Sequence, residues 1–578
     1  MQDGFVKHRW RATAGAIAVT AMCLIAAVAA AQDSEQTPDT DTLHGVILNS
    51  VTHEPIARAL VASPDNHFAT MTDSQGHFEF SLTKPQPGQA QTAASITDTR
   101  PSALVARKPG YLTEPTADAQ LEPSTKDVTL TLVPEALIIG RVRVSESEGA
   151  DKVQLELFRR QVQEGRAHWI PTGQATTRSN GEFRFAELPA GTYKVFTHES
   201  LDRDVTILPP ERAEAYGYPP VFYPAANDFG GADAIDLSPG QTFETDLLIT
   251  RQRYYTVKVP VTGMPPDGGL AISVSPVDSR GPGYTLGYSQ QTRTLEGLLP
   301  QGNYLVQVVG FGSTTVSGES ALTVREVPSA ARMTLVPANP IAVNVKEEFT
   351  SAENGAESGE TQAGNLRGVG RYLNLRLEAA EDFGSQNTIH LQPPSGHNDR
   401  SLVLEATPPG RYWVHIDASR GYAASVMAGG VDLLREPLVV ATGAATPAIE
   451  ITMRDDSAQI DGTVEGADPA LTPYNVSLAA QLGINAPGGH TNFAYIYCLP
   501  TSDSPGRYTE AVALPDGTFT LPNLPPGAYR VLAFKHPQTD LEYQNPEAMR
   551  VWEAKGQIIH LTGGQKEHVT LPITTRGE

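Results

Sequence analysis

The sequence predicts an all-β protein made of tandem β-sandwiches, and three observations carry this prediction. The 578 residues include 51 Gly and 45 Pro, a supply of turn formers typical of short strands joined by turns. Apolar and polar residues alternate with a period of two in many short runs, as strands with one buried face require. One motif of turn, strand, corner and strand recurs along the chain. The length exceeds what one hydrophobic core can fill, so several domains are expected.

The motif is clearest from Ser179 to Val195. Asn180 precedes a glycine, a pair that accepts the positive φ of a tight hairpin turn. Phe183 and Phe185 then alternate with charged residues, so one face of the strand is aromatic. A Leu-Pro-Ala-Gly corner follows, and Tyr193 after it is placed to bury its ring and return its hydroxyl to the backbone. The motif is therefore predicted to build a core rather than to bind a ligand.

Copies of this motif divide the chain into five predicted sandwiches. Parts of it return near Asp73, Leu298, Pro408 and Asp516. The predicted boundaries are 41–133, 134–250 with an aromatic tail, 251–337, 338–453 with a disordered acidic insert at 346–370, and 454–578. The spacing is near the ~100 residues of an ordinary sandwich and too uneven for a solenoid. We expect the sandwiches to be strung like beads, joined by short Pro-containing linkers.

The N-terminus is predicted to be a signal peptide, residues 1–31. Lys7, Arg9 and Arg11 form a basic region, Ala12–Val28 is apolar, and small residues precede a cleavage site after Ala31. An uncleaved N-terminal anchor is the alternative. No later segment has the length and apolar character of a membrane span. The protein is thus expected to be exported, to the periplasm, the cell surface or the medium.

The net charge narrows the classes of expected partner, and the cysteine content predicts the state of the remaining thiol. The formal net charge of −22 argues against nucleic acid and anionic membranes, because both attract basic surfaces. A glycan or another cell-envelope protein remains as the expected partner, and no cofactor is predicted. Cleavage would remove Cys23 and leave Cys498, which lies in an apolar strand-like run and is predicted to be a buried, inert thiol.

Together, these motifs resemble the carboxypeptidase regulatory-like domain. The shared pattern is Gly-x-Val, a Pro-led second strand, Asp/Asn-Gly-x-Phe and Leu-Pro-x-Gly-x-Tyr-x-Val, and the first, second and fifth sandwiches match it best. The resemblance implies a transthyretin-like, carbohydrate-binding-like β-sandwich. It supports a fold and not an activity.

A carboxypeptidase-associated hydrolase is a second alternative, and the sequence argues against it. Such zinc peptidases use a His-x-x-Glu motif, and none of the 14 His residues is followed by Glu at the third position. A Gly-x-Ser-x-Gly nucleophile elbow is also missing from the sequence. The prediction is a non-enzymatic binding, spacer or adhesion-type protein.

Turn residues with side-chain oxygens offer a further alternative, calcium binding. Asp73, Asn180 and Asp516 occupy equivalent turn positions beside a glycine. Calcium needs several converging oxygen ligands, and each of these turns supplies one side chain. Turn chemistry is the preferred interpretation, and no metal site is predicted.

The candidate binding residues lie in the aromatic tail of the second sandwich. Tyr216, Tyr218, Phe222 and Tyr223 form a Pro-interrupted cluster, and sugar rings stack on exposed aromatic faces. Carbohydrate binding through these four residues is the alternative function. The other interpretation is that the cluster packs between two sandwiches, and we favour this one. Tyr284 and Tyr288 form a weaker candidate pair.

Overall fold

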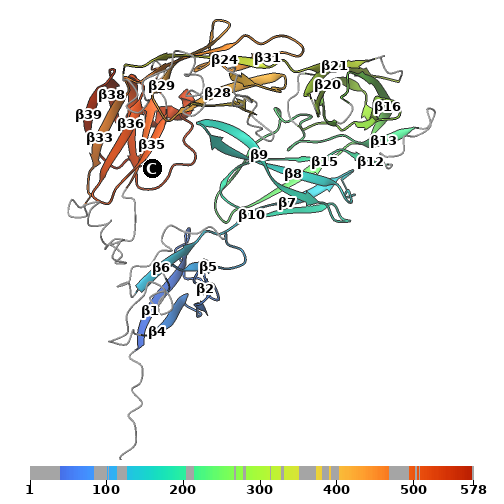
Figure 1. Ribbon diagram of the computed structural model, residues 1–578. Helices are drawn as coiled ribbons and strands as arrows, with labels where there is room; N and C mark the ends of the chain where they lie inside the picture. The colour runs from blue at the N-terminus through green and yellow to red at the C-terminus, as the bar shows by residue number, and fades with distance from the viewer. Residues whose placement is uncertain are drawn as a thin grey trace, which may run out of the picture. The chain divides into compact units, whose positions relative to one another are not determined.

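In the computed structural model, the regular elements of the described residues are β-strands paired into sandwiches, apart from one short helix and one 3-10 turn (Figure 1). The structure describes residues 40–83, 101, 103–112, 127–146, 148–202, 214–265, 268–277, 282–312, 314–326, 331–350, 373–380, 389–391, 402–467, 494–501, 504, 506 and 508–575. The predicted signal peptide, 1–31, lies outside the described residues. Within the described part, the strands form ten sheets, two for each sandwich, so the all-β prediction is confirmed.

The first sandwich has sheets of order β4-β1-β6 and β3-β2-β5. Its strands are β1 (Thr40–Asn49), β2 (Leu60–Ala62), β3 (Ala69–Met71), β4 (His77–Thr83), β5 (Val105–Arg107) and β6 (Asp127–Leu132). The second has sheets β10-β7-β15 and β14-β11-β8-β9. Its strands are β7 (Ala136–Arg143), β8 (Gln154–Gln163), β9 (Arg166–Thr176), β10 (Glu182–Leu188), β11 (Gly191–Thr197), β14 (Ile235–Leu237) and β15 (Thr242–Leu248).

The third sandwich has sheets β12-β13-β16-β19-β18, with β22 beside β16, and β17-β20-β21-β23. Its strands are β12 (Ser200–Leu201), β13 (Ala215–Tyr218), β16 (Gln252–Thr262), β17 (Gly269–Pro276), β18 (Gly287–Ser289), β19 (Thr294–Pro300), β20 (Gly302–Phe311), β21 (Val316–Val324), β22 (Met333–Thr334) and β23 (Val336–Pro337).

The fourth sandwich has sheets β27-β24-β32-β29-β30 and β26-β25-β28-β31. Its strands are β24 (Ile341–Glu348), β25 (Leu373–Ala379), β26 (Ile389–His390), β27 (Leu402–Leu404), β28 (Gly410–Ala418), β29 (Tyr422–Ala428), β30 (Val431–Asp432), β31 (Leu438–Val440) and β32 (Ile449–Arg454).

The fifth sandwich has sheets β36-β33-β39 and β35-β34-β37-β38. Its strands are β33 (Ala458–Val464), β34 (Ala494–Pro500), β35 (Thr509–Ala513), β36 (Thr518–Leu524), β37 (Gly527–Phe534), β38 (Gln557–Leu561) and β39 (Lys566–Leu571). A helix, α5 (Pro546–Met549), and a 3-10 turn, η2 (Arg550–Trp552), lie between β37 and β38.

The glycine of the repeated Gly-x-Val pattern makes room for an aromatic ring. It lies opposite a phenylalanine of the neighbouring strand in three sandwiches, in the pairs Gly45–Phe78, Gly140–Phe183 and Gly462–Phe519. A Cβ at these glycines would lie 2.2, 3.1 and 2.5 Å from an atom of the opposing ring. Any larger residue would displace the ring, and this requirement explains why the two halves of the motif occur together.

The tyrosine of the corner returns its hydroxyl to the backbone, as the sequence predicted. In four sandwiches it donates a hydrogen bond to the carbonyl oxygen of the proline four residues earlier: Tyr193 to Pro189 at 2.6 Å, Tyr304 to Pro300 at 2.9 Å, Tyr412 to Pro408 at 2.9 Å and Tyr529 to Pro525 at 2.6 Å. The rings are buried, so this bond satisfies a polar group that water cannot reach. The motif therefore belongs to the core.

The acidic turn residues make the predicted turns. The Oδ1 atom of Asp73 accepts the N–H of Gln75 and His77, and that of Asp516 accepts the N–H of Thr518. These are side-chain-to-backbone bonds that hold a turn. Among the described residues, no group of three or more His, Cys, Asp or Glu side chains is placed to hold a metal ion.

Cys498 is a free, fully buried thiol on β34. Burial raises its pKa to about 12, so the reactive thiolate is rare at neutral pH. The structure thus agrees with the predicted inert thiol.

Two features differ from the expected domain limits. Strands β12 and β13, expected in the second sandwich, are hydrogen-bonded into the sheet of the third through β16. Residues 346–348, expected at the start of the acidic insert, belong to β24, and residues 351–370 lie outside the described part. Strand pairing to a neighbouring sheet has no signature in local sequence, because any alternating segment fits an edge.

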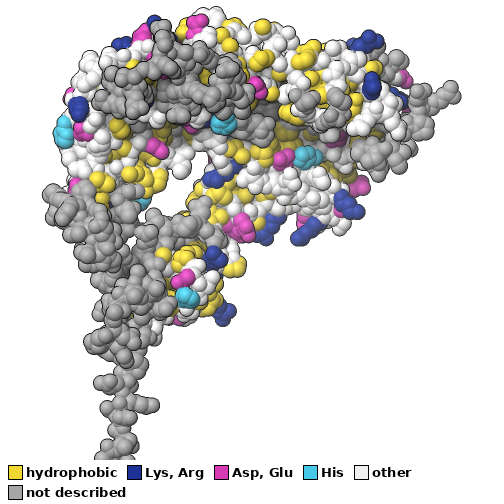
Figure 2. All heavy atoms as spheres, viewed as in Figure 1, with side chains coloured by type: hydrophobic (Ala, Val, Ile, Leu, Met, Phe, Trp, Pro, Cys, Tyr) yellow, Lys and Arg dark blue, Asp and Glu magenta, His cyan; other side chains and the backbone are white. Residues whose placement is uncertain are grey.

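The chain divides into two compact units. The first unit holds most of the first sandwich: the segment that ends at Leu48, residues 54–106 and residues 115–131. The second unit holds residues 132–578, together with 49–53 and 107–114. Each of the second to fifth sandwiches has its own buried apolar core. Figure 2 shows acidic and basic side chains interspersed over the second sandwich. Arg141–Glu182 and Arg143–Asp246 are two ion pairs of this sandwich.

Candidate functional site at the junction of the second, fourth and fifth sandwiches

A long hairpin of the second sandwich reaches the fourth and fifth sandwiches. Strands β8 and β9 pair from Gln154–Thr176 to Gln163–Arg166, and a two-residue turn joins them. Both turn residues have positive φ, 48° at Glu164 and 75° at Gly165, the geometry of a tight hairpin turn whose twist matches the strands. The hairpin is therefore a firm support for the side chains at its tip.

The hairpin contacts the loop before α5 in the fifth sandwich. The backbone N–H of Gln544 donates to the carbonyl oxygen of Gly165 at 3.0 Å. A Cβ at Gly165 would lie 2.6 Å from ring atoms of Tyr543. Glycine is thus required at this turn both by its positive φ and by the approach of the tyrosine ring.

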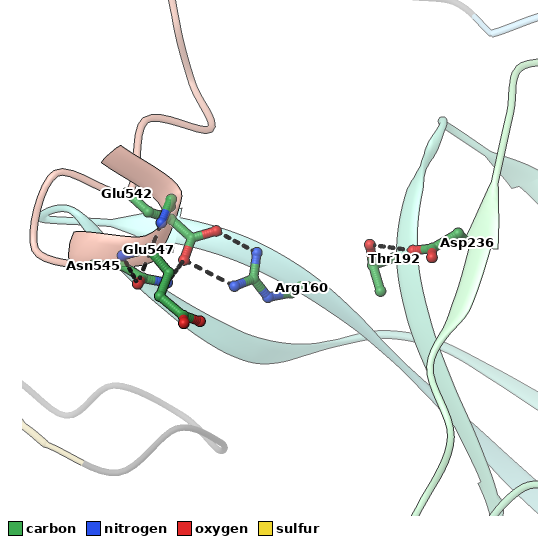
Figure 3. A network of polar contacts seen from close by, with 7 residues as sticks. Arg160, Thr192, Asp236, Glu542, Asn545 and Glu547 are labelled. Carbon is green, nitrogen blue, oxygen red and sulfur yellow. Dashed lines mark hydrogen bonds and ion pairs between the residues drawn. The ribbon is translucent and has the colours of Figure 1, made fainter. Parts of the chain in front are cut away.

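Arg160, on β8, holds Glu542 of the same loop through two parallel bonds (Figure 3). The Nη1–Oε1 distance is 2.5 Å and the Nη2–Oε2 distance is 2.8 Å. Burial alone would raise the pKa of Glu542, but the bonds from Arg160 and from Nδ2 of Asn545 hold it below its ordinary value. Asn545 also caps α5, because its Oδ1 accepts the N–H of Glu547 at 3.1 Å. This two-bond ion pair therefore joins the second sandwich to an ordered cap in the fifth.

On the other side, the hairpin meets β25 and β28 of the fourth sandwich. Oε1 of Glu164 lies 2.5 Å from Nη2 of Arg376. The guanidinium of Arg166 lies over the ring of Trp413, 3.6 Å from the ring centroid. Such a stack is attractive because the ring face is electron-rich, and more so away from water.

A buried carboxylate lies behind this stack. Glu378 is 4 % exposed; its Oε2 lies 2.7 Å from Nε2 of His415, and its Oε1 lies 3.6 Å from Nε2 of His168 on β9. Burial would raise the pKa of Glu378, but His415, His168 and Arg376 together keep it below its ordinary value. A negative charge buried between two sandwiches is tolerated when such partners surround it.

A cavity of about 380 Å³ opens beside these contacts. Aromatic, amide, guanidinium and carboxylate groups line it, among them Glu164, Arg166, Trp413, Tyr508, Asn523, Tyr543 and Gln544. The rings of Tyr508 and Tyr543 stack in parallel, with centroids 4.3 Å apart. Burial lowers the pKa of Arg166, with Tyr543, Glu378 and Glu164 opposing the effect, so the group stays charged at the cavity wall.

The sequence-predicted aromatic tail lies elsewhere, and its four rings do not share one exposed face. Phe222 is 2 % exposed and stacks on Phe196 with a centroid separation of 4.9 Å. Tyr218 and Tyr223 pack against the core of the second sandwich. Tyr216 donates its hydroxyl to Glu214 at 3.0 Å, and the guanidinium of Arg251 covers its ring.

The tail therefore packs on the second sandwich while β13 extends the sheet of the third. This is the packing interpretation that the sequence favoured. Carbohydrate binding through the four rings stays a prediction.

The weaker candidate pair lies in the third sandwich, where Tyr284 and Tyr288 pack against its core. Tyr284 meets Tyr304 edge to face, and burial raises its pKa to about 12. Nearby, burial raises the pKa of the Glu199 carboxyl to about 7, with the hydroxyl of Tyr254 opposing the effect. These groups form a half-buried polar cluster rather than a free aromatic face.

Sequence reasoning missed the junction residues. Arg160 and Glu542 are 382 positions apart, so no local pattern connects them. Trp413 did carry a signal: it follows the buried corner residue Tyr412, and alternation places a tryptophan on the outer face of the strand. A large aromatic residue on that face marks a surface that something covers.

No protein-family model and no curated protein matches the chain. The carboxypeptidase regulatory-like resemblance therefore stays a prediction. Solved structures similar to this chain include the Bacillus anthracis TIE protein (11% identity, 52% of this chain and 50% of that chain, TM-score 0.16) and the shaft pilin SpaA from Lactobacillus rhamnosus GG (13%, 36% and 97%, 0.17).

A third similar structure is a streptococcal ancillary pilin (10% identity, 52% of this chain and 100% of that chain, TM-score 0.17). This chain spans half of the length of the Bacillus anthracis protein. At these scores the likenesses carry no argument about activity or partners. Among the described residues, no helix has the length and apolar character needed to cross a membrane.

Proposed function

We propose that the chain is an exported, non-enzymatic binding or spacer protein of the cell envelope. In this proposal residues 132–578 act as one scaffold that presents surfaces to a glycan or to another envelope protein. The observation that carries it is the junction, where a hairpin of the second sandwich is held by the fourth and the fifth. A scaffold with fixed sandwiches presents its surfaces at lower entropic cost than a flexible string does.

The chemistry of the junction supports a structural rather than a catalytic role. Its carboxylates are paired with basic groups: Glu542 with Arg160, Glu164 with Arg376 and Glu378 with His415. Paired groups hold a geometry, whereas a catalytic acid or base needs access to a reacting atom. The N-terminal targeting pattern supports export.

Two experiments on the full chain test the proposal. Cell fractionation should place the protein outside the cytoplasm, with an N-terminus that begins at Gln32. Purified protein should retain envelope polysaccharide or an envelope protein in co-sedimentation and show no hydrolysis of C-terminal peptide substrates. Cytoplasmic retention would contradict the export claim, and zinc-dependent peptide hydrolysis would contradict the non-enzyme claim.

Carbohydrate binding at the aromatic tail is the second candidate, favoured by the partial exposure of Tyr216 and Tyr218 on the short strand β13. The Tyr216→Ala and Tyr218→Ala variants should then lower retention on polysaccharide gels. Phe311→Ala, which removes an exposed ring of the same sandwich, is a matched control. Unchanged retention of the tyrosine variants would remove this candidate.

A further inference from the structure

We propose that the cavity beside Arg166 binds a sugar that carries a carboxylate, such as a uronic acid residue of a glycan. The inference rests on the proposed binding function and names the ligand class for its junction. Three features point to it: a desolvated guanidinium, a wall of aromatic rings and amide side chains at the rim.

The guanidinium of Arg166 is half-buried. Within the described part of the chain it forms no ion pair and no hydrogen bond. The nearest acidic groups have other partners. Glu164 lies 2.5 Å from Arg376, and Glu378 lies 2.7 Å from His415. Stacking on Trp413 fixes the plane of the guanidinium and leaves its N–H groups at the edge. A planar fork of donors is suited to two parallel bonds with a carboxylate.

The remaining walls suit a sugar ring. Tyr508 and Tyr543 line the cavity. They stack on each other and Gly165 approaches the ring of Tyr543, so the surface left for sugar C–H groups is the outer side of Tyr508 and the ring edges. The amides of Asn523 and Gln544 line the same cavity and both donate and accept hydrogen bonds, as sugar hydroxyls require. A volume of about 380 Å³ lies in the range of small-ligand pockets and holds one or two sugar rings.

A peptide with a free C-terminus also carries a carboxylate. Strand β28, which contributes Trp413 and His415, pairs with β25 from Tyr412 to Ala418 and with β31 from Gly410 to Tyr412. The carbonyl oxygen of Gly165 at the hairpin tip already accepts from Gln544. The aromatic and amide side chains of the lining favour the sugar, and preference for the tripeptide is an outcome of the test.

Isothermal titration calorimetry on the full chain tests the proposal. The probes are trigalacturonic acid, the neutral trisaccharide of galactose, and a tripeptide with a free C-terminus. We expect the acidic sugar to bind at least tenfold more tightly than the neutral one, because a charge-assisted hydrogen bond is worth about a factor of ten or more. Arg166→Gln should lose this preference, and Arg166→Lys should keep part of it, because lysine retains the charge but not the planar fork.

Arg178→Gln removes an exposed arginine of the same sandwich and is the matched control. It should leave the affinity unchanged.

Hydrogen exchange at the Gln544 amide shows whether the junction stays closed in each variant. Equal affinity for both sugars, preference for the peptide, or no heat of binding at millimolar sugar overturns the proposal. If the junction is closed and no sugar binds, the ligand assignment fails and the scaffold stands; if Gln544 exchanges freely in the unmodified protein, the scaffold itself fails.

Discussion

Two regions of the second sandwich differ in what they contact. The corner from Ser179 to Val195 makes its contacts within its own sandwich, and its features return in other sandwiches. The hairpin tip from Gln163 to Arg166 makes contacts with the fourth and fifth sandwiches. The repeated residues therefore fix the fold of each sandwich, whereas residues found once decide how the sandwiches are joined.

The largest effect is expected at the corner's core, from Gly140→Ala. A Cβ there would lie 1.6 Å from the carbonyl oxygen of Thr245 on the parallel strand β15. We expect the free energy of unfolding of the second sandwich to fall by about 3 kcal/mol, the cost of overpacking a tight site. Denaturant-dependent hydrogen exchange in β7 and β10 measures it.

Gly269→Ala is the control, because a Cβ at Gly269 meets no heavy atom within 4 Å. It should change stability by less than about 0.5 kcal/mol. Equal effects of the two substitutions would show that the repeated glycine is not needed for space.

The next effect is expected at the junction, from Arg160→Ala. It leaves the Glu542 carboxylate, 11 % exposed, without the two bonds from the guanidinium. The free energy needed to open the junction should fall by about 2 kcal/mol, since an unpaired, largely buried charge is costly. Limited proteolysis of the loop before α5 reports this opening.

Arg141→Ala, which breaks the exposed pair Arg141–Glu182, is the matched control and should cost under about 1 kcal/mol. A faster cleavage in Arg141→Ala than in Arg160→Ala would contradict the role given to the hairpin.

A smaller effect is expected from Tyr193→Phe, which removes the 2.6 Å bond to the carbonyl of Pro189 and keeps the ring. Stability of the second sandwich should fall by about 1 kcal/mol. The junction should stay closed, because this bond lies inside the sandwich. Exchange rates in β11 compared with those of the loop before α5 separate the two outcomes, and equal changes in both would break the distinction between corner and hairpin.

The smallest effect concerns pH. The pKa of Glu378 is lowered in the folded protein, so its contribution to stability is present above its ordinary pKa of 4.5 and is lost as the pH falls through the folded value. The junction should loosen below about pH 4.5, by under about 1 kcal/mol. Glu378→Gln should remove this acid dependence. An acid dependence that is unchanged in this variant would assign the effect to other groups.

Local sequence predicted the features that depend on neighbouring residues. The hydroxyl bond of Tyr193 spans four residues and the turn at Asp73 spans two to four, so each is encoded in one short motif. The buried thiol of Cys498 likewise follows from its apolar surroundings.

The junction could not be predicted in this way. The pair Arg160–Glu542 joins segments 382 positions apart, and each residue alone has the character of a solvated charge. The aromatic tail was identified as a cluster, but its pairing with β16 depends on which sheet edge is free. The bead-like arrangement expected from the repeat also does not describe residues 132–578, which form one compact unit.

Hydrogen exchange at the single amide of Gln544 tests the central claim most directly, because this N–H donates to Gly165 across the junction at 3.0 Å. We predict that the amide is protected in the full chain and that its protection falls in Arg160→Ala while β11 keeps its own. A Gln544 amide that exchanges as fast as an unstructured one in the unmodified protein would contradict the claim that the hairpin joins the sandwiches.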